Sequence, residues 1–79
     1  MEELFELARK VLGEHLGIAP ETIDWDTTFE EIDADSIDVV EMIMAIEDHY
    51  EVEFPEDDLD QYKTFGSLIK ALWQYLNSR

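Results

Sequence analysis

The sequence of 79 residues is long enough for one small domain with a single hydrophobic core, and we take residues 1–79 as that domain. It contains no cysteine, which excludes disulfides and thiolate metal sites, and no apolar stretch is long enough to cross a membrane. Five basic and 21 acidic residues give a net charge of −16, which disfavours nucleic acids and anionic lipids and favours partners with basic patches.

The first three residues, Met1-Glu2-Glu3, lack the basic stretch of a secretory signal peptide, so we expect a cytoplasmic protein. We also expect a monomer. The excess of negative charge opposes folding through self-repulsion. Salt or magnesium ions are therefore expected to raise the melting temperature.

The first predicted helix covers residues 3–16, where apolar residues recur at helical spacing. Its apolar face consists of Leu4, Leu7, Ala8, Val11 and Leu12. His15 lies in the last turn, where a histidine complements the helix dipole, and we interpret it in this way rather than as a metal ligand. Gly17 is a natural helix end, and Pro20 prevents the helix from continuing.

A long connection follows, from residue 18 to residue 35, and such a length indicates either a function or a required topology. Four apolar residues are expected to anchor it to the core: Ile23, Trp25, Phe29 and Ile32. Thr28 and Glu31 have the spacing of a capping pair, which predicts a short helical turn inside the connection.

The second predicted helix covers residues 36–50. Asp35 is its expected N-cap and Asp38 the capping-box partner, which puts Ser36 at the first helical position. Unpaired N–H groups and the helix dipole favour an anion there, so a phosphate ester on Ser36 would be well placed. From this pattern alone, an ordinary helix-start serine is the favoured interpretation.

This helix has two distinct faces. Its core face is predicted to consist of Val39, Met42, Ile43, Ile46 and Tyr50. A second stripe alternates between apolar and acidic residues and consists of Ile37, Glu41, Met44 and Asp48. The stripe is either a docking strip, with apolar contacts and steering charges, or the edge of the core.

Residues 51–55 are predicted to be an extended connector with Val52 or Phe54 turned inward. Pro55 can open a short helix over residues 56–62, and Thr64 caps a last helix that ends near Asn77. The apolar face of the last helix consists of Phe65, Leu68, Ile69, Leu72 and Leu76. The predicted fold is therefore an all-α four-helix bundle, with three long helices, one short helix and a long loop between the first two.

Several kinds of chemistry are excluded. A calcium loop starting at Asp33 fails, because Asp38 stands where glycine is required and Met44 where the closing glutamate is required. The two histidines lack a recognisable metal-ligand spacing, and a domain of this size offers little cleft for a substrate. We therefore predict no metal site, no catalytic residue and no enzymatic activity.

The sequence resembles the acyl carrier proteins over nearly its whole length. Residues 28–38 are similar to the segment in which that family attaches its cofactor, and Phe54-Pro55 and residues 63–66 are similar to further family positions. The resemblance implies a 4′-phosphopantetheine arm on Ser36, installed from coenzyme A by a phosphopantetheinyl transferase, with Asp35 and Asp38 helping to position it. The thiol of the arm would carry acyl thioesters in fatty acid, or related specialised lipid or polyketide, synthesis.

The resemblance also implies two groups of interaction residues. The surface expected to bind basic patches on synthase enzymes consists of Ile37, Glu41, Met44, Glu47 and Asp48. The acyl pocket is expected to be lined by Phe29, Ile43, Ile46, Phe54, Leu59, Tyr62 and Leu68. Three of these, Leu59, Tyr62 and Leu68, are bulkier than is common in the family, which predicts a tight pocket for short or unusual acyl groups.

Two residues depart from the family pattern. Asp33 replaces the usual glycine and Ile37 the commoner leucine, which leaves open which synthase and transferase accept this chain. Two alternatives to an acyl carrier also remain. One is an aminoacyl or peptidyl carrier of the same fold, and the other is an acidic helical interaction module in which Ser36 is never modified.

Overall fold

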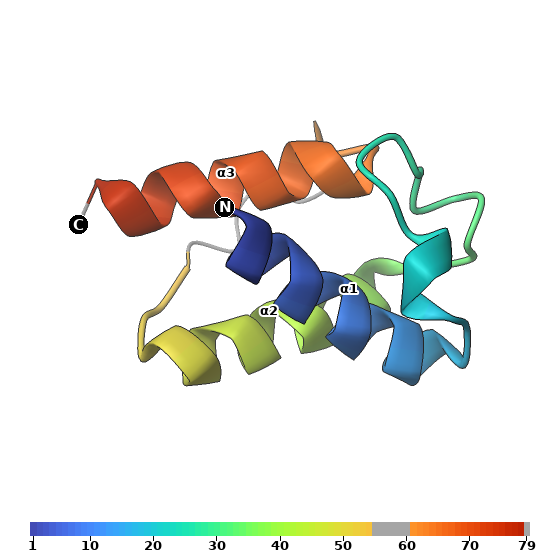
Figure 1. Cartoon of the computed structure of the whole chain (residues 1–79), viewed down its shortest axis with the longest axis horizontal. Helices are drawn as coiled ribbons and strands as arrows, with labels where there is room; N and C mark the ends of the chain where they lie inside the picture. The colour runs from blue at the N-terminus through green and yellow to red at the C-terminus, as the bar shows by residue number, and fades with distance from the viewer. Residues whose placement is uncertain (55–60, 79) are drawn as a thin grey trace.

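The computed structural model describes residues 1–54 and 61–78, and Figure 1 shows three long helices joined by loops. The elements are α1 (Glu2–Leu16), the short 3-10 helix η1 (Pro20–Thr22), α2 (Ser36–Tyr50) and α3 (Phe65–Asn77). The all-α prediction and the three long helices are confirmed over the described residues. The fourth, short helix expected over residues 56–62 is not confirmed, because most of that range lies outside the described residues.

Helix α1 ends where the sequence predicts. Gly17 adopts the left-handed conformation, with φ of 74°, and its N–H donates to the carbonyl of Gly13. The N–H of Ile18 donates to the same carbonyl at 2.9 Å, so this turn closes the helix. No helix of the described residues is both long and apolar enough to span a bilayer.

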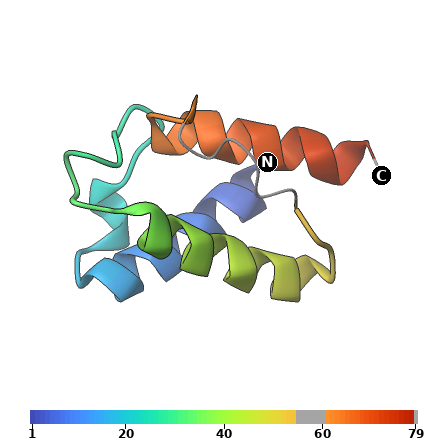
Figure 2. The same cartoon turned by 180° about the vertical axis from the view of Figure 1, so that it is seen from behind.

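The core lies between the three long helices. Helices α1 and α2 pack against each other, and α3 lies along one side of the pair, as Figures 1 and 2 show from opposite sides. The largest fully buried side chains are Phe65, Leu4, Leu12, Ile23, Met42, Ile43, Ile46, Leu68 and Ile69. The predicted core face of α2 is confirmed, with Tyr50 at its half-buried end.

The long connection between α1 and α2 is held by its apolar anchors. Ile23 is fully buried, and the ring of Trp25 stacks on that of Phe5 with centroids 4.3 Å apart. Arg9 adds polar contacts from α1, because its side chain donates to the carbonyls of Pro20 at 3.2 Å and Ile23 at 2.9 Å. These contacts fix the first half of the connection against α1.

The second half of the connection pairs with the segment that leads into α3. The N–H of Phe65 donates to the carbonyl of Thr27 at 2.8 Å, and that of Phe29 donates to the carbonyl of Lys63 at 3.1 Å. Thr28 and Thr64 form an isolated antiparallel bridge between these bonds. Backbone pairing therefore holds residues 27–29 beside residues 63–65, next to the start of α2.

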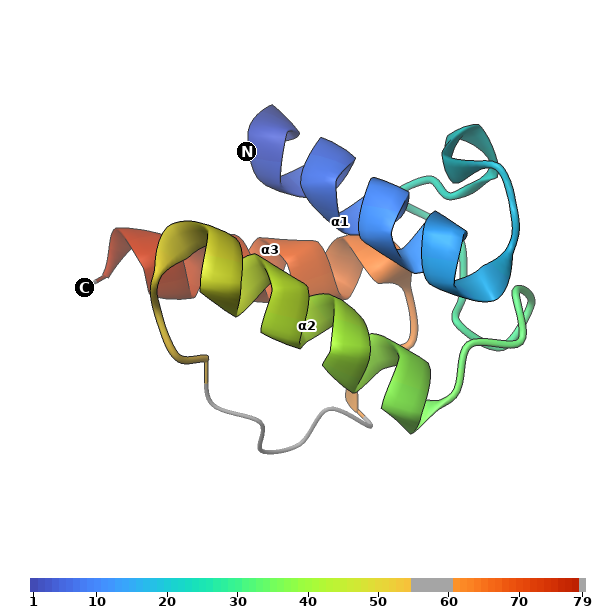
Figure 3. The same ribbon diagram turned by 90° about the horizontal axis from the view of Figure 1, so that it is seen from below.

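The chain leaves α2 as an extended connector. Glu51 closes the helix in the left-handed conformation, with φ of 55°. Phe54 is buried and Val52 is half-buried, as the sequence predicts, and the N–H of Phe54 donates to Glu47 Oε2 at 2.7 Å. Figure 3 shows this connector leaving the end of α2, and Figure 1 shows it, in yellow, running toward α3.

Candidate functional site

The start of α2 is fixed by a reciprocal pair of hydrogen bonds. The N–H of Asp38 donates to Asp35 Oδ1 at 3.1 Å, and the N–H of Asp35 donates to Asp38 Oδ2 at 3.0 Å. The predicted capping box is therefore confirmed. Ser36 follows the N-cap as the first residue of the helix, and its side chain is exposed to solvent.

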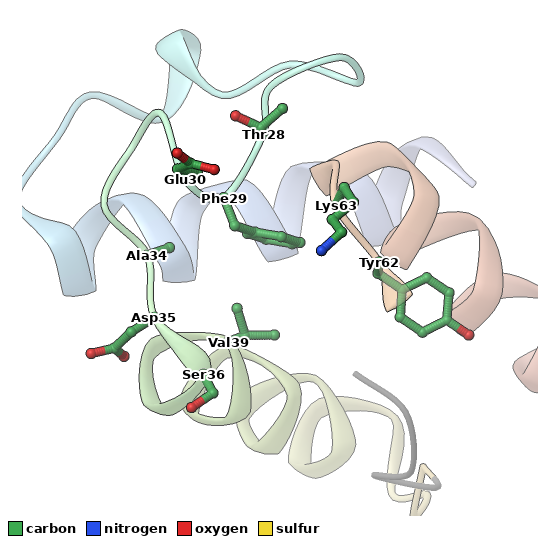
Figure 4. Close-up of a pocket in the computed structure, with 9 residues that line it drawn as sticks. All are labelled: Thr28, Phe29, Glu30, Ala34, Asp35, Ser36, Val39, Tyr62 and Lys63. Atoms are coloured by element: carbon green, nitrogen blue, oxygen red, sulfur yellow. The ribbon is translucent and has the colours of Figure 1, made fainter. Parts of the chain in front are cut away.

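A pocket of about 410 Å³ opens beside Ser36. Its walls come from the end of the long connection, the start of α2 and the segment before α3. The lining residues are Thr28, Phe29, Glu30, Ala34, Asp35, Ser36, Val39, Tyr62 and Lys63. Figure 4 shows Asp35 and Ser36 on one side of this pocket, and Tyr62 and Lys63 on the opposite side.

Helix α1 also contacts the capping box. His15 Nε2 lies 2.7 Å from Asp38 Oδ1, and the Asp38 side chain is largely shielded from solvent. The pKa of Asp38 is lowered, mainly by the hydrogen bond from the Asp35 backbone and further by the neighbouring imidazole, while burial acts in the opposite direction. The position of His15 in the last turn of α1 predicts an interaction with the helix dipole. Its contact with Asp38 was not predicted, because it depends on how α1 and α2 pack.

The turn that leads to Ser36 is strongly curved. Thr28 and Glu31 cap it reciprocally, as predicted, with hydrogen bonds of 2.7 and 3.1 Å between each N–H and the other side chain. Asp33 adopts the left-handed conformation, with φ of 56°. This conformation is the one that glycine enters at least cost, so the residue that departs from the family pattern stands where the backbone favours glycine.

Comparisons with known proteins identify the family. Residues 6–72 match the family model described as "Phosphopantetheine attachment site". An acyl carrier protein of Chlamydia trachomatis serovar L2 is 36% identical over 70 residues, which cover 87% of this chain and 91% of that protein. An acyl carrier protein of a Sulfurovum species is 38% identical over 70 residues, covering 87% of this chain and 93% of that protein. The chain belongs to the acyl carrier protein family.

This membership establishes several points about the carrier. It contains a phosphopantetheine attachment domain, so covalent 4′-phosphopantetheine is its cofactor. Acyl carrier proteins carry intermediates rather than catalyse reactions, usually in fatty acid synthesis, and they interact with synthase enzymes and a phosphopantetheinyl transferase. The geometry around Ser36 fits the cofactor, because an exposed hydroxyl stands at the edge of a pocket.

The stripe along α2 of the carrier is exposed. The side chains of Ile37 and Met44 are 67% and 52% exposed, and both Glu41 and Asp48 face solvent. Glu47 is half-buried, with one carboxylate oxygen bound to the Phe54 N–H. The stripe is thus a surface feature rather than the edge of the core. A shallow hollow beside it is lined by Met44, Glu47, Asp48, Glu51, Val52, Glu53 and Tyr75, and the sequence analysis did not include Tyr75.

The residues expected to form the acyl pocket of the carrier are found in two places. Phe29 and Tyr62 line the pocket beside Ser36. Four others lie in the buried core: Ile43, Ile46, Phe54 and Leu68. Leu59 lies outside the described residues. Two other residues that line the pocket beside Ser36 were not expected there. Val39 was predicted to be a core residue, and Lys63 was assigned no role in a pocket.

Proposed function

We propose that Ser36 is the attachment residue for 4′-phosphopantetheine and that this carrier holds acyl intermediates of fatty acid, or related specialised lipid or polyketide, synthesis. The observation that supports this proposal most is the exposed Ser36 hydroxyl at the first position of α2, beside a pocket and inside the family match. When attached, the arm supplies the thiol that a cysteine-free chain lacks.

The residues around Ser36 have defined roles in this proposal. Asp35 and Asp38 are positioning residues, because their reciprocal hydrogen bonds hold the backbone on both sides of the serine. The first N–H groups of α2 have no partners within the helix, and together with its dipole they favour a phosphate ester at Ser36. The chain thus presents a nucleophile to the transferase and provides no catalytic group of its own.

We propose the exposed stripe of α2 as the docking surface for the transferase and the synthase enzymes. The proposed surface consists of the stripe residues Ile37, Glu41, Met44 and Asp48 together with the half-buried Glu47. The charge of −16 steers these partners through their basic patches, and weak contacts allow a shuttle to leave as readily as it binds. In the same proposal the carrier works as a monomer in the cytoplasm, where its thiol stays reduced.

The cargo is proposed to be a short or unusual acyl group. Burial of a long acyl chain would be favourable by about 0.8 kcal/mol of free energy for each methylene, but only if the core opened to admit it. Support comes from the core itself, since Ile43, Ile46 and Leu68 are closely packed there. Tyr62 lines the pocket beside Ser36, and Leu59 lies outside the described residues. Rates of thioester hydrolysis test this point, because strong protection of a long acyl chain would contradict it.

The decisive experiment is the intact mass of the purified chain after incubation with coenzyme A, magnesium and a promiscuous phosphopantetheinyl transferase. We expect the gain of one arm in the wild type and none in Ser36→Ala. The matched controls are Ser67→Ala and Ser78→Ala, which remove the other two serines and should leave the gain intact. No gain with several transferases would instead favour an unmodified interaction module. An aminoacyl carrier would also gain the arm, and only its partner enzymes would distinguish it from an acyl carrier.

A further inference from the structure

The surroundings of Ser36 are unfavourable for another negative charge. Glu30 and Asp35 line the pocket together with Ser36, and Asp38 follows two residues later. A phosphodiester on Ser36 would add a further negative charge, and the covalent bond would keep that charge near these carboxylates. Like charges around one pocket repel one another, and because Glu30, Asp35 and Ser36 are exposed, salt weakens the repulsion. A cation near the phosphate would therefore matter.

Lys63 lines the pocket beside Ser36, although the chain contains few basic residues. It is one of five basic residues and lines the pocket on the side opposite to Ser36 (Figure 4). Its backbone is held there, because its carbonyl accepts the Phe29 N–H at 3.1 Å and the next residue, Thr64, bridges to Thr28. The position of Lys63 is thus set by the pairing of two loops and not by its own side chain.

Within the described part of the chain, the side chain of Lys63 is free to bind an anion. It is exposed, and no carboxylate within residues 1–54 or 61–78 forms an ion pair with it. Two other cations have different surroundings, since Arg9 is bound to Glu6 and to backbone carbonyls, and Lys70 lies 6.0 Å from the Trp25 ring. Figure 4 shows the Lys63 side chain directed into the pocket.

We infer that the ammonium group of Lys63 binds the phosphate of the arm on Ser36 and holds that end of the arm against the pocket. The inference rests on the proposed attachment at Ser36. A lysine binds a phosphate as a compact point charge, without the fixed two-point geometry of an arginine, and its flexible stem lets the ammonium group adjust to the position of the phosphate. Lys63 thereby offsets the repulsion from Glu30 and Asp35, and it restricts the directions in which the arm leaves the helix.

Two measurements on the apo and holo forms test this inference. The first is the melting temperature, compared between apo and holo protein in the wild type, Lys63→Gln and the matched control Lys70→Gln. In the wild type and the control, attachment should change the melting temperature equally. In Lys63→Gln, the melting temperature of the holo form minus that of the apo form should be about 1–4 °C lower than in the wild type. This deficit should disappear in 1 M salt. The second is the ¹⁵Nζ resonance of Lys63, which should move on attachment while that of Lys70 stays unchanged.

The outcome separates this inference from the proposed function. Lys63→Gln should still gain one arm by intact mass, because Ser36 is unchanged. If the arm is attached but its effect on melting is the same in all three proteins and the Lys63 resonance does not move, the phosphate contact is wrong and the attachment site stands. If no protein gains the arm, the proposed function fails first.

Discussion

His15 at the end of α1 and Asp38 in the first turn of α2 are joined by a contact of 2.7 Å between Nε2 and Oδ1. The other oxygen of Asp38 accepts the N–H of Asp35, which directly precedes Ser36. One carboxylate therefore links the packing of two helices to the backbone that presents the proposed attachment residue.

Replacing His15 with glutamine should raise the pKa of Asp38 part of the way toward its usual value of 3.8. The rise is partial because the largest cause of the lowered pKa, the hydrogen bond from the Asp35 backbone, remains. The carboxyl carbon of Asp38, followed by NMR during an acid titration, reports this value. His49→Gln is the control, since His49 contacts Glu3 instead, and an equal effect of both substitutions would refute the role of His15.

The same carboxylate predicts a pH dependence of stability. A lowered pKa in the folded state means that ionised Asp38 stabilises the fold fully above its unfolded pKa, near 3.8, and that this stabilisation is lost as the pH falls through the folded pKa. The free energy of unfolding should thus differ most between the wild type and Asp38→Asn at neutral pH. The difference should shrink below about pH 4 in urea titrations. A constant difference down to pH 2 would contradict this.

Asp33→Gly should stabilise the protein by about 0.5–1 kcal/mol, because glycine adopts the left-handed conformation of this position without steric cost. This gain is reduced, but not cancelled, by the larger backbone entropy that glycine loses on folding. Part of any gain will come from removing a negative charge. Asp33→Asn is the matched control, since it removes the same charge and keeps a Cβ atom. Thermal melting should rank glycine above asparagine, and the reverse order would show that the backbone conformation is not limiting.

Gly66→Ala should destabilise the fold by about 1–3 kcal/mol through steric overlap. A Cβ atom at this position would lie 2.5 Å from the carbonyl oxygen of Trp25 and 2.9 Å from its ring. The overlap would also disturb the hydrogen bond from the Gly66 N–H to that oxygen. In a Trp73→Phe background, the fluorescence of Trp25 should change in Gly66→Ala.

Gly17→Ala provides the contrast for this prediction. Apart from Gly17 and its two chain neighbours, no described residue has an atom within 4 Å of a Cβ built on Gly17, so the cost of this substitution comes from the positive φ. This variant should melt at a lower temperature and keep the fluorescence of Trp25. Unchanged fluorescence and stability in Gly66→Ala would show that the close approach of the two segments is unimportant.

The charges of the α2 stripe should control the speed of docking. We expect the double variant Glu41→Gln, Asp48→Asn to be modified by a transferase about 3–10-fold more slowly at low salt, because steering by charge raises association rates. The control is Glu14→Gln, Glu21→Gln, which removes equal charge from exposed positions on α1 and η1. Equal rates for the two double variants would mean that overall charge, rather than the stripe, attracts the transferase.

Local patterns were sufficient to predict much of this fold. The apolar spacing gave the three long helices, and the residue types at their ends gave the caps at Asp35 and Thr64. Helical geometry also placed Ile37 and Met44 off the core face, but only the structure decided that they are exposed rather than packed at the edge of the core. These features depend on residues a few positions apart, which a sequence displays directly.

Contacts between distant segments were not predictable in this way. The bond from His15 to Asp38 depends on how two helices cross, and the position of Lys63 depends on backbone pairing between residues 27–29 and 63–65. The positive φ of Asp33 was also missed, because an aspartate does not mark a left-handed turn as clearly as glycine does. The pocket beside Ser36 is built from such contacts, so only two of its nine lining residues were among those expected for the acyl pocket.

The central claim is tested most directly by locating the arm in the modified protein. Fragment mass spectra of the product formed with coenzyme A and the transferase should place one phosphopantetheinyl group on Ser36. A group on Ser67 or Ser78, or modification that persists in Ser36→Ala, would contradict the account.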